Sequence, residues 1–403
     1  MNELFSAAVV ARPAISPRLA AYAISAWLFF LIGLVLTILG PTVPAIRRTF
    51  DLDLAAAGLL FVAQSGGYMV AIPPAGYLVD ARGRRLTAAL GAGALAVGAF
   101  LMGFAPAWPV LLAGSVLSGI GFACADVAAN ALVSDASGPE KTVAMNLAHA
   151  FFALATLLGP LGLGFLLSAG VSWRIAYALV GMAALPALLI VPFTPFPAYT
   201  AQPLPGLPAL LRLAQRQEVW RAALVLGLYV GAEVSIAGWL VTFLQQQFGW
   251  SEALGSWALS GYWGGFLGGR LLIGILARRL ASGRLLRGCC VGALLSSLLG
   301  AVAPWPALAV VCYTVTGVSI SGIFPTVMAI TLQRFPAYTG AVTALLIMGG
   351  AVGSTLLPGT LGAAGQLAGM RGAMLLLPLI FAAMLVLVVG TNAPAHPVQA
   401  VRR

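Results

Sequence analysis

Two acidic residues, Asp126 and Glu233, lie inside long apolar stretches of this 403-residue chain. A charged carboxylate in an apolar layer costs about 2.5 kcal/mol or more, so each is expected to face partners or water and is a functional candidate. Because apolar surroundings disfavour the charged form, Asp126 is suited to take up and release a proton. The alternative is a permanent ion pair with a buried cation such as Arg270. For Glu233, binding of a ligand or cation competes with hydrogen bonding between helices.

Amide and imidazole side chains follow Asp126 at helical spacing. Asn130 lies one turn further along the same expected helix, and Asn146 and His149 are three residues apart on the next one, so each pair shares a helix face. A histidine changes charge between about pH 5 and 8, which suits His149 to relay a proton or to bind a substrate hydroxyl. The alternative is a neutral histidine in the core. Two such faces would line a polar cavity.

Aromatic side chains near the middle of the expected helices, together with one glutamine, complete the candidate binding set: Trp27, Gln64, Trp239, Tyr262 and Trp263. Apolar and aromatic side chains line most small-molecule sites, while a few polar groups fix the orientation of the ligand. Each ring taken alone has the alternative of ordinary packing or of an anchor at the membrane interface. Arg270 shares one helix face with Tyr262 and Phe266, and we expect a structural or gating ion pair there rather than ligand contact.

The elements that must position these residues are membrane-spanning helices. The chain is 61% hydrophobic and only 8% charged, whereas soluble domains carry about 25% charged residues. Stretches such as 86–106 and 373–390 are apolar on every face, which excludes the alternating pattern of a membrane β-barrel. We predict an all-α membrane protein with twelve spans, at residues 19–46, 54–79, 86–106, 109–133, 142–169, 175–193, 222–245, 254–277, 286–303, 306–331, 340–368 and 373–391.

The spans are divided by a proline-rich segment, 194–221, that we interpret as a cytoplasmic linker. Shifting the chain against itself by 198 positions aligns glycines, prolines and one phenylalanine of the two halves, among them Gly33 with Gly231 and Pro160 with Pro358. We therefore predict two six-helix bundles, 1–193 and 222–403, as a parallel repeat related by an axis along the membrane normal.

The formal charge of +11 is explained by topology. With both termini in the cytoplasm, most of the 21 Lys and Arg residues fall on the cytoplasmic side, as the positive-inside rule requires. The charge therefore does not indicate nucleic-acid binding, and we expect a multi-pass protein of the cell (inner) membrane.

One loop carries a recognisable motif: Gly76-Tyr77-Leu78-Val79-Asp80-Ala81-Arg82-Gly83-Arg84-Arg85. It resembles the G-x-L-x-D-x-x-G-R-[RK] signature of the major facilitator superfamily, and the twelve spans, the repeat and the linker extend the resemblance over the whole chain. The resemblance implies alternating access. It also implies a conformational role for Gly76, Asp80, Gly83, Arg84 and Arg85, whose ion pairs would form in one state and break in the other. The alternative is a solvated topology signal. The corresponding position of the second half has Arg278 instead of the acid.

A narrower resemblance is to the fucose-permease branch of that superfamily. It rests on the run Asp126-Val127-Ala128-Ala129-Asn130, on Gly138-Pro139-Glu140 and on the helix start at Asn146. The branch uses the acid at the position of Asp126 for proton coupling, and the resemblance therefore implies proton-coupled import of a sugar. The second acid of the best known sugar symporter is absent, since the region reads Leu39-Gly40-Pro41-Thr42.

The expected partners are a small-molecule substrate, the lipid bilayer and a coupling proton, with sodium as the alternative ion, and we expect a monomer. An exporter of drugs or metabolites is the nearest alternative, because Gly159-Pro160-Leu161-Gly162 resembles part of the antiporter motif. A sensor that binds without transport is a further alternative. An enzyme is not expected, because two histidines and four apolar-segment cysteines provide neither a catalytic set nor a metal site. No cofactor is predicted.

Overall fold

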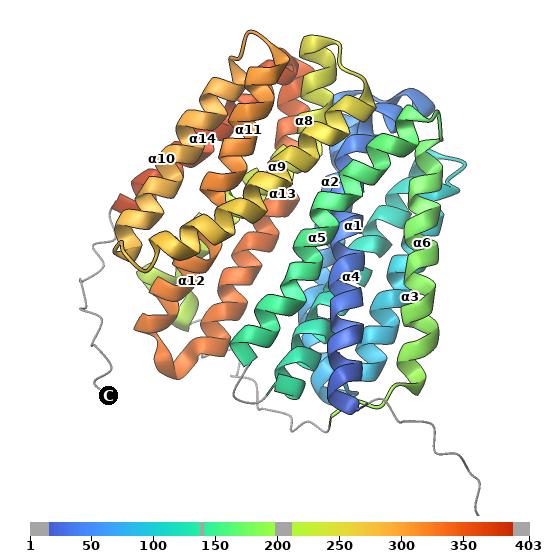
Figure 1. Cartoon of the computed structure of the whole chain (residues 1–403), viewed down its shortest axis with the longest axis vertical. Helices are drawn as coiled ribbons and strands as arrows, with labels where there is room; N and C mark the ends of the chain where they lie inside the picture. The colour runs from blue at the N-terminus through green and yellow to red at the C-terminus, as the bar shows by residue number, and fades with distance from the viewer. Residues whose placement is uncertain (1–15, 138–140, 198–211, 390–403) are drawn as a thin grey trace, which may run out of the picture.

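The computed structural model describes residues 16–137, 141–197 and 212–389, a region built of helices without strands (Figure 1). Its first half contains α1 (Pro17–Phe50), α2 (Leu54–Ala81), α3 (Arg84–Gly103), α4 (Trp108–Ser137), α5 (Lys141–Ser168), α6 (Trp173–Ile190) and the short η2 (Val191–Phe193). Its second half contains α8 (Gln217–Phe248), α9 (Glu252–Leu276), α10 (Ser282–Ala301), α11 (Pro306–Ile320), α12 (Ile323–Arg334), η3 (Pro336–Tyr338), α13 (Thr339–Met374) and α14 (Leu376–Val389). Residues 198–211 of the linker, the loop 138–140 and both chain ends lie outside the described residues.

Polar caps and glycines define where several helices begin and end. The carboxylate of Asp53 accepts the backbone N–H of Ala56 at 2.7 Å and starts α2, and the hydroxyl of Ser251 accepts that of Leu254 at 3.2 Å and starts α9. Such caps satisfy N–H groups that have no partner inside the helix. Gly249, with φ of 69°, ends α8 in the left-handed conformation that glycine adopts most readily.

Ten helices of the described region are long and apolar enough to cross a membrane, counting α11 and α12 together. α9, which contains Arg270, and the 14-residue α14 occupy the two remaining predicted spans. The predicted span 306–331 is interrupted at Ser321 and Gly322, because Pro325 has no N–H to bond the carbonyl of Ser321. The predicted boundary between the last two spans falls at Gly369, which has φ of 72° inside α13.

The helices pack as two groups. α1 to α6 form the N group, in which α1 contacts α4, α5 and α6, and α4 contacts α2 and α3. α8 to α14 form the C group, in which α8 contacts α9, α12, α13 and α14, and α11 contacts α9 and α10. We call the end of the molecule with the turn at Gly83 the Gly83 end, and the end with the turn at Asp51 the Asp51 end.

The two groups are joined toward the Asp51 end. There Arg48 of α1 pairs with Glu252 of α9 at 2.5 Å, and the N–H of Leu54 donates to Gln366 Oε1 at 3.1 Å. Nearer the middle, the Ser260 hydroxyl of α9 donates to the carbonyl of α5 at residue 157 over 3.0 Å. Figure 1 shows the same arrangement: α5 and α9 approach each other toward the upper end and diverge toward the lower end, where α1 begins. The molecule is thus closed at the Asp51 end.

Glycines permit this closure by bringing backbones together. A Cβ atom added to Gly40 of α1 would overlap the carbonyl oxygen of Ala237 in α8. A Cβ on Gly362 of α13 would lie 2.8 Å from the carbonyl oxygen of Leu54 and 2.7 Å from the Trp239 ring. Small residues at such positions let membrane helices approach closely. Any larger side chain must therefore push the groups apart at this end.

We expect Gly40→Ala to open the Asp51 end. Because the added methyl meets backbone, which cannot rotate away as a side chain can, the closed contact of α1 with α8 is lost. The reporter is a cysteine replacing the buried Leu54, labelled with a membrane-impermeant maleimide from the Asp51 side. Labelling should rise several-fold. The control is Gly162→Ala, where a Cβ meets no atom within 4 Å, and equal labelling in both variants would contradict the prediction.

Candidate transport site

The centre of the site is the carboxylate of Asp126 on α4. Tyr68 on α2 donates its hydroxyl to Oδ2 at 3.1 Å, and Asn130 donates its amide to Oδ1 at 2.8 Å and to the Asp126 carbonyl at 2.9 Å. Both carboxylate oxygens therefore accept a hydrogen bond, an arrangement that an ionised carboxylate can adopt. The partners of Asp126 are neutral donors, and among the described residues Arg270 forms no ion pair with it.

His149 on α5 extends this network. Its Nε2 lies 3.2 Å from Asn130 Oδ1. Because the Asn130 NH2 group is already directed at Asp126, its oxygen accepts and the histidine donates. The imidazole also packs on Phe29 of α1, with ring centroids 4.2 Å apart. Four helices of the N group thus hold one chain of contacts, from Tyr68 through Asp126, Asn130 and His149 to Phe29.

The C group contributes a second polar set. The side chains of Glu233 and Tyr229, one turn apart on α8, are hydrogen-bonded. Arg270 on α9 lies over the ring of Phe266, 4.9 Å from its centroid, and its charge interacts with both Glu233 and His149. Arg270 is exposed. It thus provides an electrostatic connection from the C group to the network of the N group.

The other predicted binding residues are distributed over several places. Asn146 is exposed one turn before His149, and Gln64 is buried on α2. Trp239 is fully buried at the contact between groups, where its indole N–H donates to the carbonyl of Pro358 at 2.8 Å. Trp27 is 38% exposed and donates to the carbonyl of Ala183 on α6, away from His149.

Two further predicted aromatics, Tyr262 and Trp263, are stacked edge to face with centroids 5.2 Å apart. Both are buried, and neither the Tyr262 hydroxyl nor the Trp263 indole N–H has a hydrogen-bond partner in the described part of the chain. The Tyr262 hydroxyl interacts electrostatically with Glu233. These two residues therefore belong with the polar set of the C group.

Several residues of the site were not predicted. Tyr68 and Phe29 contact Asp126 and His149 from neighbouring helices, and Tyr229 bonds Glu233. Of these only Tyr229 carried a usable signal, since it is four residues before Glu233 on one helix. The partners on other helices depend on how each helix is rotated about its own axis, and a single sequence does not reveal that rotation.

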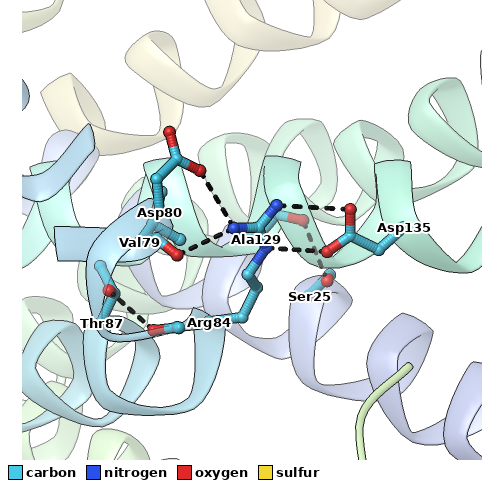
Figure 2. A network of polar contacts seen from close by, with 8 residues as sticks. Ser25, Val79, Asp80, Arg84, Thr87, Ala129 and Asp135 are labelled. Atoms are coloured by element: carbon cyan, nitrogen blue, oxygen red, sulfur yellow. Dashed lines mark hydrogen bonds and ion pairs between the residues drawn. The ribbon is translucent and has the colours of Figure 1, made fainter. Parts of the chain in front are cut away.

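The motif residues form a separate network at the Gly83 end, shown in Figure 2. The guanidinium of Arg84 pairs with Asp135 at the end of α4, at 2.8 Å, and with Asp80 at 3.1 Å, and donates to the carbonyl of Val79. Gly83 allows this turn because its φ of 92° disfavours other residues. Asp135, which the sequence reasoning did not identify, thus joins α4 to the loop between α2 and α3.

Two further motif residues with a predicted conformational role, Arg85 and Gly76, lie near this network. Arg85 donates to the carbonyl of Thr194 at 2.9 Å and so contacts the segment that follows η2. A Cβ at Gly76 would meet no atom within 4 Å. Arg270 does not share the network; it belongs to the site of the C group.

Replacing Arg84 with alanine should destabilise the protein by about 2 kcal/mol, because Asp135 then loses a charge-assisted partner in a largely buried place. Thermal unfolding in detergent is measured with a thiol-reactive dye, since the four cysteines are free and buried. The unfolding midpoint of Arg84→Lys should lie between those of wild type and Arg84→Ala, because lysine keeps the positive charge but not the bidentate geometry of arginine. The exposed Arg82 provides the control Arg82→Ala. An unchanged midpoint in Arg84→Ala would contradict the stabilising role.

Comparison with known proteins agrees with this architecture. The family model of the Major Facilitator Superfamily matches residues 25–298 and 222–403. A "Glucose/galactose transporter" of Brucella abortus biovar 1 (strain 9-941) is 26% identical over 360 residues, which are 81% of this chain and 84% of the relative. The "Sodium-dependent glucose transporter 1A" of Mus musculus is 24% identical over 372 residues, 83% of this chain and 87% of the relative.

Solved structures show the same fold. A bacterial homologue of the human lysosomal transporter Spinster, in an inward-facing and unoccupied conformation, superposes with a TM-score of 0.77 at 16% identity and covers 93% of this chain and 97% of its own. A variant of the E. coli fucose:proton symporter FucP superposes with a TM-score of 0.66 at 22% identity, over 93% of this chain and 99% of its own. With the family model matching nearly the whole sequence, the chain belongs to the major facilitator superfamily of membrane transporters.

Proposed function

We propose that this protein imports a sugar, or a similar small polar metabolite, together with a proton by alternating access. The observation that carries the proposal is the network of Asp126, Tyr68, Asn130 and His149 inside an apolar bundle. It combines an acid able to exchange a proton with amide and imidazole groups able to bind hydroxyls. The names of the relatives, which include glucose and galactose transporters, support a sugar as the substrate.

We assign the Gly83 end to the cytoplasm, because the basic loop Arg82 to Arg85 lies there and positive charge marks the cytoplasmic side. The Asp51 end then faces outward, and both chain ends are cytoplasmic. The structure, joined at the Asp51 end, corresponds in this assignment to a state that is closed to the outside. The two bundles, 1–193 and 222–403 with the linker 194–221 between them, would rock about the central site in a single copy of the chain.

Proton coupling assigns a sequence of events to the network. From the outside, Asp126 would be protonated and substrate would bind between the groups, on Asn130, Asn146, His149 and Glu233. In the closed-outside structure both oxygens of Asp126 accept hydrogen bonds from neutral donors, which fits an acid that has already released its proton inward. Substrate contact with both polar sets would link the groups, because they belong to different bundles.

The remaining assignments concern binding and conformation. Trp27, Gln64, Trp239, Tyr262 and Trp263 remain candidates for substrate contact. Rocking of the bundles would change which side chains line the central site, so their positions in this one state do not decide their role. The motif residues around Arg84 would stabilise one state through Asp80 and Asp135. Arg270 would act between the bundles through its charge.

The test is the external pH of lightly buffered cells during addition of hexoses, pentoses and polyols. Wild type should alkalinise the medium with at least one sugar, because proton and sugar enter together. Asp126→Asn removes the titratable group while keeping the shape, and should abolish the alkalinisation. Asp53→Asn is the matched control, because asparagine caps a helix as well as aspartate does.

The alternatives give different outcomes of the same assay. Sugar uptake that requires sodium and leaves the pH unchanged would assign sodium as the coupling ion. No response to any sugar, combined with proton-driven extrusion of dyes or metabolites, would overturn import in favour of an exporter.

A further inference from the structure

A cavity lies between the two groups at the Asp51 end, apart from the network around Asp126. Its volume is about 720 Å³, within the range of about 300–1,000 Å³ that is typical of small-molecule sites. Arg48, Ser172 and Trp173 belong to the wall on the N group, and Gln245, Glu252 and Trp257 to the wall on the C group. The contact of Ser260 with the carbonyl at residue 157 lies between this cavity and the central site.

The wall offers both hydrogen-bond donors and acceptors but little net charge. Arg48 and Glu252 neutralise each other at 2.5 Å, and the Arg48 side chain remains 61% exposed, so its other N–H groups are accessible. The hydroxyls of Ser172 and Ser251 accept backbone N–H groups as helix caps, which leaves their hydrogens free to donate. Gln245 adds an amide. Such a wall suits a neutral ligand with many hydroxyl groups.

Trp257 supplies the aromatic part of this wall. Its ring packs on Phe165 with centroids 5.3 Å apart, and its indole N–H is buried without a hydrogen-bond partner in the described part of the chain. An indole with mixed polar neighbours is a common means of holding a sugar, because the ring covers the C–H face while the polar groups bind the hydroxyls.

We propose that this cavity is an outer sugar site that binds external substrate while the Asp51 end is closed. The inference rests on the proposed function for the orientation and the ligand class. Because its two walls belong to different groups, opening the Asp51 end would separate Gln245 and Glu252 from Arg48 and Ser172. A sugar held by both walls therefore stabilises the closed state, by the factor 1 + [L]/Kd that applies to any ligand of one state only.

The consequence is inhibition of uptake by the substrate itself. At an external sugar concentration equal to the Kd of the outer site, the population of the closed state relative to the outward-open state rises about two-fold. The return to the outward-open state then slows by the same factor. The initial rate of uptake should pass through a maximum and fall as external D-glucose or D-galactose is raised.

The test compares initial rates of uptake of radiolabelled D-glucose and D-galactose in wild type, Gln245→Ala and Gln246→Ala. Gln245 lines the cavity, whereas Gln246 is its exposed neighbour on α8 and does not. The fall at high sugar should disappear in Gln245→Ala and persist in Gln246→Ala. Simple saturation in wild type, or an identical fall in both variants, would overturn the outer site.

Equilibrium binding of the same sugars to the purified full chain in detergent separates the two proposals. Two sugars should bind per wild-type chain, and one per chain in either Asn130→Ala or Gln245→Ala. One sugar per wild-type chain, unaffected by Gln245→Ala, overturns the outer site while uptake still supports the proposed function. If no sugar is taken up, the proposed function fails. The outer site is then decided by binding alone: it is supported if Gln245→Ala binds one sugar fewer than wild type, and overturned if it does not.

Discussion

The whole structure depends on one constraint: in a bilayer, polar groups have no water to bond and must find partners inside the protein. The backbone satisfies it by forming helices. Side chains satisfy it one by one, as Thr37 does by bonding the carbonyl of Gly33 in its own helix, and as Asp126 does by accepting from Tyr68 and Asn130. An ionisable group kept in such a place at this cost is a functional candidate.

The proposed alternating access requires the two groups to come apart, and the same constraint explains how they would do so. Their closed contact uses few strong polar links and much backbone approach at glycines such as Gly40 and Gly362. In lipid there is little hydrophobic driving force that brings apolar helix surfaces together. The association of the two groups therefore depends on close packing. An interface of this kind is tight when closed and exposes few unsatisfied groups when open, and the ion pair of Arg48 with Glu252 lies at its outer margin, where the side chain of Arg48 is exposed.

The polar groups are divided between the two groups of helices in a way that suits coupling. Asp126, Asn130 and His149 form a continuous network in one group, while Glu233 and Arg270 belong to the other. The positive charge of Arg270 in the C group also interacts with His149 in the N group. Under the proposed function, a molecule bound between them would contact both sets and would therefore affect how the groups sit relative to one another.

The sequence by itself determined the helices and the motif, because these follow from local hydropathy and spacing: the span predicted at 54–79 is α2, and a glycine at 369 separates the last two spans. It also singled out Asp126, since a carboxylate in an apolar run is visible without a structure. Only the tertiary structure decided which helix faces meet. The pairing of Arg84 with Asp135, the bond from Tyr68, and the separate places of Trp27 and Trp239 depend on helix rotation and on closure at the Asp51 end. Those are set by packing between helices far apart in the chain, and no local pattern records them.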